Sequence, residues 1–297
     1  MSRTVFTAIV GNPNVGKSTL MNRLIGAKIS IISHKPQTTR TRIIGIITEG
    51  DLQYVFYDTP GYHIPHTKLG EYMQRFIRDA VDGIDVALLL VNPTGSFDEN
   101  EKKLLEELKR SGTPVILVVN KFDTVSSEES GKLLVESLIK NESFPDVMTI
   151  SALTGQGLRE LKHRISKYAV AGPFMFDEDA LTDTPERVIV AELLRERLLV
   201  HLSDELPHGI AVIIESFKER PGGDLIDINV SVICEKKSHK GMIIGKEGGM
   251  LKKVASEARQ NIEDFLGCRV NLKCWVRVRE GWRDKESLLR EIGFSVR

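Results

Sequence analysis

Short apolar runs alternate with helical patterns over residues 4–168 of the chain. Six runs are expected to be strands: 5–10, 43–48, 52–57, 86–91, 115–119 and 147–150. Helical patterns cover 19–24, 69–81, 100–110, 131–140 and 158–168. The first, fourth and fifth runs are almost continuously apolar, as in strands that are buried on both faces of a sheet. This alternation predicts an α/β domain with a mainly parallel, doubly wound sheet.

The pattern changes after residue 171. Ala-Gly-Pro at 171–173 ends a helix, and the acidic stretch 174–184 has no clear period, which is typical of a linker. Its first three residues, 174–176, are expected to pack at the domain joint. A helix is expected over 185–204, a hairpin from two alternating runs at 209–217 and 225–234, a helix that ends near 266, a strand over 269–279 and a short helix over 287–292. We therefore predict a domain over 1–171, a linker over 172–185 and a second, α+β domain over 186–297.

Charged residues are distributed unevenly along the chain. The 297 residues have a formal net charge of zero, but residues 228–297 hold 15 basic and 9 acidic side chains, and residues 171–227 hold 5 and 13. A basic terminal module favours an anionic partner, either nucleic acid or a membrane surface. No apolar run approaches the roughly 18 residues of a membrane span. The three cysteines have no paired spacing, so we expect free thiols and a cytoplasmic protein.

A phosphate-binding loop follows the first predicted strand. The segment Gly-Asn-Pro-Asn-Val-Gly-Lys-Ser-Thr fits the spacing G-x-x-x-x-G-K-[ST] and opens onto a helix. In this setting backbone N–H groups converge on phosphate oxygens at the helix N-terminus, and the lysine ammonium adds a point charge. The predicted nucleotide-binding residues of this loop are Gly11, Asn12, Pro13, Asn14, Val15, Gly16, Lys17, Ser18 and Thr19.

Three further motifs also stand at strand ends, where a doubly wound sheet binds its ligands. Asp58 can reach Mg²⁺, and the Gly61 N–H can meet a γ-phosphate. The carboxylate of Asp123 can accept from N1–H and the 2-amino group of guanine, a pair of donors that adenine lacks. The backbone N–H of Ala152 is expected to reach the guanine O6. These motifs add Asp58, Thr59, Pro60, Gly61, Tyr62, Asn120, Lys121, Phe122, Asp123, Ser151 and Ala152 to the predicted site.

A second site is predicted in the basic module. A Gly-x-x-Gly loop, Gly245 to Gly248, joins an apolar turn at 242–244 to the long helix that follows. Backbone N–H groups and lysines can bind the phosphates of single-stranded RNA there, above an apolar floor for bases. The predicted RNA-binding residues are Lys240, Ile243, Ile244, Gly245, Lys246, Glu247, Gly248, Lys252, Arg277 and Arg283. Trp275 is either a core residue of the last strand or an extension of this surface.

With these motifs in place, the first 170 residues resemble a GTPase domain of the Era family, and the order helix–strand–strand–helix–helix–strand that follows resembles a type II KH domain. The resemblance implies a GTPase that uses GTP/GDP and Mg²⁺, with catalytic roles for Lys17, Thr39 and Gly61. Residues 36–40, Pro-Gln-Thr-Thr-Arg, resemble the first switch of these proteins. Mg²⁺ is then held by Ser18, Asp58 and Thr39, although Thr38 is adjacent and the sequence does not separate the two threonines.

Two features bear on the rate of hydrolysis. Many GTPases place a water-orienting Gln directly after Asp-x-x-Gly, whereas this chain has Tyr62 there. Intrinsic hydrolysis is therefore expected to be slow. In similar GTPases an asparagine at the position of Asn14 holds a K⁺ beside the phosphates, so K⁺ is a candidate cofactor; the alternative is an Asn that only caps the turn.

The resemblance to the Era family covers essentially the whole chain. It implies binding of a monomer near the 3′ end of 16S rRNA, action in 16S rRNA processing and small ribosomal subunit assembly, a link to growth or the cell cycle, and peripheral association with the membrane. Two rivals are a GTPase that powers RNA modification and an RNA chaperone with a vestigial nucleotide site. The first needs a catalytic Cys or metal cluster, and intact Lys17, Ser18, Asp58 and Asp123 argue against the second.

Overall fold

The computed structural model describes residues 1–33, 35, 38–140, 144–202 and 206–294. By contacts the chain forms two compact units. The first unit consists of Met1–Ser30, Thr39–Pro65 and Tyr72–Asp183; the second consists of Ile31–Thr38, His66–Glu71 and Thr184–Arg297. Two short segments of the amino-terminal half therefore pack with the carboxy-terminal half.

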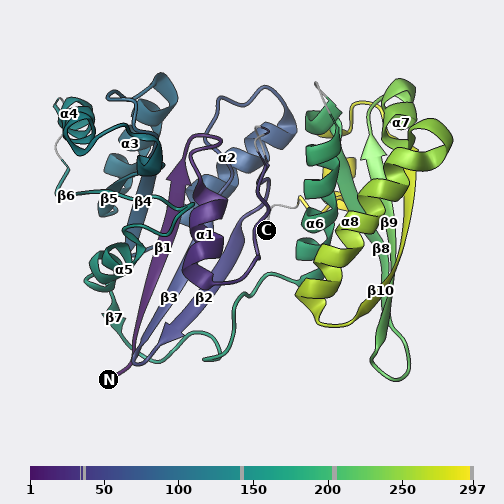
Figure 1. The fold of residues 1–297 in the computed structure, drawn as a ribbon, viewed down its shortest axis with the longest axis horizontal. Coiled ribbons are helices and arrows are strands. Elements are labelled where there is room, and N and C mark those ends of the chain that lie inside the picture. Colours follow the sequence, from purple (N-terminus) through teal and green to yellow (C-terminus); the bar gives the residue numbers. More distant parts are fainter. Residues whose placement is uncertain (34, 36–37, 141–143, 203–205, 295–297) are drawn as a thin grey trace. The chain divides into compact units, whose positions relative to one another are not determined.

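The first unit contains a mainly parallel sheet with strand order β2-β3-β1-β4-β5-β6 (Figure 1). Its strands are β1 (Arg3–Gly11), β2 (Ile43–Glu49), β3 (Leu52–Asp58), β4 (Val86–Val91), β5 (Val115–Val119), β6 (Asp146–Thr149) and β7 (Val170–Ala171). All six expected strands are present within one or two residues. Only β2 and the short β7 run antiparallel to their neighbours, β3 and β1. The α/β prediction is confirmed.

Five α-helices of the described chain cover this sheet: α1 (Lys17–Ile25), α2 (Lys68–Val81), α3 (Glu99–Ser111), α4 (Glu128–Ile139) and α5 (Leu158–Ser166). Side chains of α2, α3 and α4 form one core cluster with alternate residues of β1, β4 and β5, while α1 and α5 contact β1. Strands β4 and β5 are buried at every position, which explains their unbroken apolar sequences.

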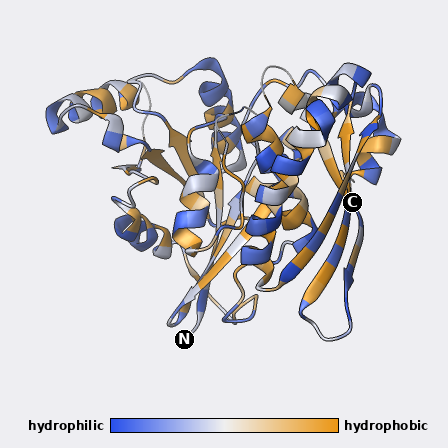
Figure 2. Cartoon of the chain, turned by 45° about the vertical axis from the view of Figure 1, so that its right-hand side comes forward, coloured by the Kyte–Doolittle hydropathy of each residue, from blue (hydrophilic) through white to orange (hydrophobic). Residues whose placement is uncertain are grey.

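The second unit is a three-stranded sheet of order β10-β9-β8 with α6, α7 and α8 on one face. Its elements are α6 (Glu186–His201), β8 (Ala211–Glu219), β9 (Leu225–Cys234), α7 (Lys237–Ile244), α8 (Gly249–Leu266), β10 (Arg269–Val278) and α9 (Glu286–Glu291). Hydrophobic and hydrophilic bands alternate along its strands (Figure 2), because one face packs on α6, α7 and α8 and the other face does not. The expected helix–strand–strand–helix–helix–strand order is confirmed.

Three local expectations need correction. The apolar stretch 242–244 is the last turn of helix α7 rather than a separate turn. Helix α6 ends at His201 and Leu202 is its extended C-cap, while residues 203–204 of the expected range lie outside the described residues. The linker runs along the first unit: Gln53 is bonded to the backbone of Met175 and Phe176, and Ile46 N–H donates to Leu181. Met175 was expected to pack at a domain joint, but 60% of it is exposed.

The three cysteines are free thiols, as expected. Cys234 is buried, and burial raises its pKa and that of Cys274, the latter to about 12. Across the part of the chain that the structure describes, none of the helices combines the length and the apolar character needed to span a bilayer.

Candidate nucleotide site and RNA surface

The phosphate-binding loop lies between β1 and α1, and its two outer glycines fit only because they have no side chain. Gly11 has φ +146°, and a Cβ there would come 2.3 Å from the carbonyl oxygen of Leu90. Gly16 has φ +100°, and a Cβ there would come 2.3 Å from the amide nitrogen of Asn120. The loop therefore approaches its neighbours too closely for any other residue.

Lys17 carries a buried ammonium group whose partners are backbone carbonyls of the loop. Its Nζ donates to the carbonyl oxygens of Gly11, at 3.1 Å, and Asn12, at 2.8 Å. Burial lowers the pKa of Lys17 to about 8, against the opposing effect of Asp58. A desolvated cation in a loop of converging backbone groups is suited to an anionic ligand that supplies the missing counter-charge.

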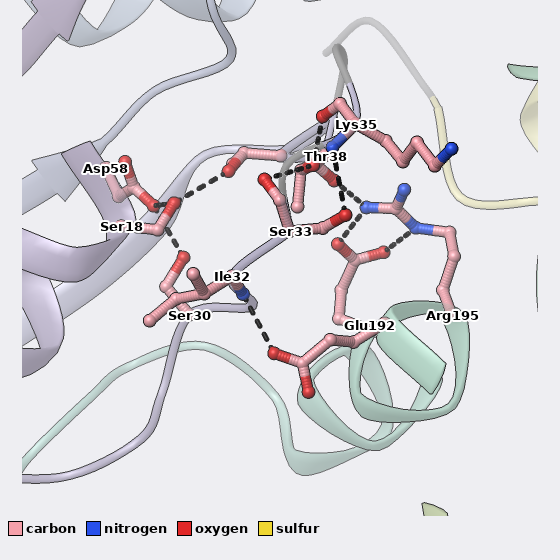
Figure 3. Close-up of polar contacts among 11 residues, drawn as sticks. Ser18, Ser30, Ile32, Ser33, Lys35, Thr38, Asp58, Glu192 and Arg195 are labelled. Atoms are coloured by element: carbon pink, nitrogen blue, oxygen red, sulfur yellow. Dashed lines mark hydrogen bonds and ion pairs between the residues drawn. The ribbon is translucent and has the colours of Figure 1, made fainter. Parts of the chain in front are cut away.

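Hydroxyl and carboxylate oxygens converge behind the loop (Figure 3). Asp58 Oδ2 accepts from Ser18 Oγ at 2.7 Å and from Ser30 Oγ at 2.5 Å, and Ser18 Oγ lies 3.0 Å from Thr39 Oγ1. Asp58 Oδ1 is buried and has no hydrogen-bond partner among the described residues. Burial raises the pKa of Asp58, against the lowering effect of its two serine bonds. An all-oxygen set with an orphaned carboxylate oxygen fits Mg²⁺.

The two neighbouring threonines have different environments. Thr39 Oγ1 faces Ser18, whereas Thr38 Oγ1 donates to the carbonyl oxygen of Lys35 at 2.6 Å. Pro36 and Gln37 of the expected first switch lie outside the described residues. The geometry therefore favours Thr39 as the threonine that belongs to the oxygen cluster.

Within the second unit, charged side chains of α6 bond to the backbone of Ile32 and Thr38 (Figure 3). Glu196 Oε1 accepts from the Ile32 N–H at 2.9 Å. Arg195 donates to the carbonyl oxygen of Thr38 and to Glu192. Arg195 and Glu196 are both at least 98% buried, so these contacts offset the desolvation of their charges.

The expected guanine side is built around Asn120. Its Nδ2 donates to the carbonyl oxygen of Val15 at 2.8 Å, and its Oδ1 accepts from the Ala152 N–H at 2.9 Å. Lys121 Nζ donates to the carbonyl oxygen of Asn14 at 2.6 Å. Asn120 therefore connects its own loop, which also carries the exposed Asp123, to the loops of Val15 and Ala152. The Ala152 N–H, which is expected to reach guanine O6, donates to Asn120 Oδ1 in this structure.

The Asp-x-x-Gly turn faces the phosphate-binding loop. A Cβ on Gly61 would come 2.8 Å from the backbone nitrogen of Pro13, and Thr59 Oγ1 donates to the carbonyl oxygen of Ile9. Tyr62 is 7% exposed and its hydroxyl donates to Glu107 of α3 at 3.0 Å. Its side chain is thus part of a core cluster, and its backbone N–H donates to the carbonyl oxygen of Gly11 in the loop.

The Gly-x-x-Gly loop joins α7 to α8 in the second unit. Gly245 and Gly248 have φ +72° and +77°, and the intervening Glu247 has φ +52°. A Cβ on Gly245 would come 2.6 Å from the Cβ of Met250, whereas open space surrounds Gly248. The loop is flanked by the exposed lysines Lys240, Lys246 and Lys252.

Two predicted RNA contacts need revision. Ile243 is fully buried in the core of the second unit, so it supports the surface from below, and only Ile244 is part-exposed. Arg283 donates from Nε and Nη2 to the two carboxylate oxygens of Glu235, at 3.1 and 2.8 Å. Arg277 is half-exposed and lies 3.6 Å from Glu215.

Sequence reasoning missed Ser30, Arg195 and Glu196. Ser30 stands in no motif, and its position depends on Asn22, whose side chain is bonded to both backbone groups of Ser30. Arg195 and Glu196 interrupt the apolar face of α6, and that interruption was the available signal. Among the residues that the structure describes there is no cluster of three His, Cys, Asp or Glu side chains that could hold a metal.

Comparison with known proteins adds the following findings. The family described as "50S ribosome-binding GTPase" matches residues 6–121, and the family described as "KH domain" matches residues 205–283. GTPase Era of Caldanaerobacter subterraneus subsp. tengcongensis is 45% identical over 99% of this chain and 98% of its own length. GTPase Era of Clostridium perfringens is 47% identical over 99% of both chains.

Two solved structures are similar over their whole length. A crystal structure of Era in complex with MgGDPNP and nucleotides 1506–1542 of 16S ribosomal RNA has a TM-score of 0.95 and 35% identity, covering 100% of both chains. A variant of Aquifex aeolicus Era bound to GDP and AlF₄⁻ has the same TM-score and identity, covering 99% of this chain and 100% of its own.

Proposed function

This chain belongs to the GTPase Era family, and we propose that it is a GTP-controlled RNA-binding switch. Its first unit binds GTP and GDP with Mg²⁺ and hydrolyses GTP, and its KH domain binds single-stranded RNA near the 3′ end of 16S rRNA. The Era structure with MgGDPNP and nucleotides 1506–1542 supports both halves of this proposal. The biological role is then in 16S rRNA processing and small ribosomal subunit assembly, with a coupling to growth or the cell cycle.

The observation that carries the nucleotide half is the position of Asn120. By bonding to Val15 and Ala152 it fixes the Asn-Lys-x-Asp turn against the phosphate-binding loop. That leaves the carboxylate of Asp123 exposed beside the loop, where it can accept two hydrogen bonds from guanine. Adenine offers no such donor pair, so the site should select guanine nucleotides.

Each catalytic group then has one task. Lys17 neutralises phosphate charge, the N–H of Gly61 donates to the γ-phosphate, and Thr39 joins Ser18 and Asp58 as the oxygen set that holds the metal. Mg²⁺ supplies charge stabilisation for the transferring phosphoryl group. Since Tyr62 bonds to Glu107, no side chain directly after Gly61 orients the attacking water, and we propose a slow intrinsic rate.

Asn14 is proposed to hold K⁺ beside the phosphates. It has φ +63°, a conformation that Asn tolerates, and it precedes Val15 and Gly16 in the loop. A cation that stabilises the transition state by only about 1.4 kcal/mol accelerates hydrolysis about tenfold. We therefore expect GTP hydrolysis to be at least about tenfold faster in K⁺ than in Na⁺, and Asn14→Asp to change this ratio. Equal rates in both salts, for the wild type and the variant alike, would rule the site out.

The domain limits are proposed at 1–171 for the GTPase domain, 172–185 for the linker and 186–297 for the KH domain with its tail. The chain is proposed to act as a monomer in the cytoplasm. An anionic membrane surface is a second proposed partner of the basic residues in 228–297, because lipid and RNA phosphates attract them alike. Competition between anionic liposomes and an RNA oligonucleotide separates the two.

Gly248→Asp tests the RNA half of the proposal with a matched control. Gly248 has a left-handed backbone and open space around it, so Asp and Asn both fit at little cost. The Asp carboxylate repels a phosphate at the loop, and we expect RNA affinity to fall roughly 10- to 100-fold at low salt. Gly248→Asn, of the same shape but uncharged, should bind within a few fold of the wild type. Equal losses in both variants would mean that the loop does not contact phosphate.

The RNA target is tested by crosslinking the full chain to cellular RNA with a non-hydrolysable GTP analogue present, followed by sequencing. We expect enrichment of the 3′ end of 16S rRNA. Recovery of no discrete RNA, or of a different RNA, would remove the ribosomal assignment while leaving the GTPase activity standing.

A further inference from the structure

Strand β10 presents two different faces. Its even-numbered residues, including Val270 and Val276, pack into the core beneath α6 and α8. Its odd-numbered residues point to the opposite face of the sheet, and they are Arg269, Asn271, Lys273, Trp275 and Arg277. Three cationic side chains and one aromatic ring thus share the face that these helices leave uncovered.

The two tryptophans of the chain have opposite environments. Trp282 is fully buried and its Nε1 donates to the carbonyl oxygen of Gly209 at 3.0 Å. Together with α9 it covers Ile213 and Ile233 at one end of the face opposite α6 and α8. Trp275 lies beyond this cover and is 48% exposed. A large aromatic side chain left on an open sheet face is the arrangement on which sheet-based RNA-binding domains stack bases.

Trp275 borders a shallow hollow of about 410 Å³ in this face. The hollow is lined by Glu215, Asn229, Trp275, Val276 and Arg277. Asn229 is held in place by its Nδ2, which donates to Ser216 Oγ at 2.7 Å. The hollow therefore combines a stacking surface with a fixed polar side chain.

Charge decides which partner fits this face. Lys273 and Arg277 flank Trp275 at a distance of about 7 Å along the strand, and both are exposed. Glu215 is an exposed and therefore weak partner for Arg277 at 3.6 Å. Asp227 is already occupied by Arg220 and Asn271. An aromatic ring between two cations can stack on a base and bind the phosphates on either side of it. A protein partner fits this face less well, because the core of a protein–protein interface is depleted of charged residues.

Strand β10 carries this face and also contacts the helix that leads into the Gly-x-x-Gly loop. Helix α7, which leads into Gly245, packs against β10, and β10 pairs only with β9 among the described strands. Its outer edge therefore has no neighbouring strand in this sheet. A single strand bound at the Gly-x-x-Gly loop can pass around this edge to the opposite face.

We propose that Trp275, Lys273 and Arg277 form a second single-stranded RNA subsite on the face of the KH sheet opposite α6 and α8, where Trp275 stacks on a base and the two cations bind flanking phosphates. This inference rests on the proposed RNA-binding function and extends the footprint of the RNA beyond the loop.

The test uses the full chain and RNA of nucleotides 1506–1542, with truncations from each end down to about four nucleotides. A KH loop clamps about four nucleotides, so only the longer RNAs can reach both sites. We expect long RNA to quench the fluorescence of Trp275, and the quenching to be absent in Trp275→Phe, in which only the buried Trp282 emits. Trp275→Ala should lower the affinity for long RNA about tenfold and leave the affinity for the shortest bound RNA unchanged.

Matched charge variants complete the test. Lys273→Ala should lower the affinity for long RNA and the salt dependence of its binding. The control is Lys218→Ala, on strand β8 of the same unit, which should change neither quantity. Wild-type affinity of Trp275→Ala for every RNA, or quenching by none, would overturn the subsite. Loss of self-association in Trp275→Ala would assign the face to a second copy of the chain instead. If Gly248→Asp also binds all RNAs normally, the proposed function fails, and not this inference alone.

Discussion

Replacing Asp123 by asparagine is expected to lower the affinity for GTP by roughly two to four orders of magnitude. The carboxylate accepts two hydrogen bonds from guanine, and each bond to a charged group contributes about 1.5–3 kcal/mol. Asparagine offers an amide N–H where the 2-amino group of guanine also donates, so the two donors face each other. Titration calorimetry of GTP against the wild type and the variant measures the loss.

The same variant should gain affinity for xanthosine triphosphate. Xanthine has a carbonyl oxygen in place of the 2-amino group, and the side-chain amide of the Asp123→Asn variant can donate to it. Glu128→Gln removes an exposed carboxylate of the same unit and is the matched control, which should leave GTP affinity unchanged. If Asp123→Asn binds GTP as well as the wild type does, position 123 does not read the base.

Exchanging Thr39 for valine is expected to slow GTP hydrolysis by roughly 100-fold, the usual cost of losing one preorganised electrostatic contact. Valine keeps the shape of threonine but removes the hydroxyl that lies 3.0 Å from Ser18 Oγ. The Mg²⁺ concentration that gives half-maximal activity should rise as well. Single-turnover hydrolysis over a Mg²⁺ titration provides both values.

Thr38→Val is the control for this exchange, because the Thr38 hydroxyl donates to Lys35 within its own loop. We expect its Mg²⁺ dependence to stay within a few fold of the wild type. A larger defect in Thr38→Val than in Thr39→Val would reverse the assignment of the two threonines.

Most of the fold could be predicted from periodicity. Strands β4 and β5 are unbroken apolar runs between turn signals, and their burial at every position is what such runs imply. Strand β7 could not be predicted, because it is two exposed residues long and exists only by pairing with β1. The grouping of Ile31–Thr38 with the second unit also depends on contacts with residues more than 150 positions away.

The candidate nucleotide site was predictable to the level of its motifs, because each of the four stands at a strand end. The hydrogen-bond partner of each group could not be predicted. The Ala152 N–H bonds to Asn120, and the Tyr62 hydroxyl bonds to Glu107; both partners lie far away in the sequence. Trp275 is a different case, because it shares the odd-numbered positions of β10 with Lys273 and Arg277. That register indicated an exposed face, although a tryptophan in a strand is more often buried.

One titration tests the central claim that guanine nucleotide controls RNA binding. Labelled RNA of nucleotides 1506–1542 is titrated with the full chain in the presence of Mg²⁺ and either a non-hydrolysable GTP analogue, the matching ATP analogue or no nucleotide. The account predicts that the GTP analogue changes RNA affinity at least about fivefold, the lower end of typical coupling between two sites, and that the ATP analogue has no effect. Equal RNA affinity in all three samples would contradict it.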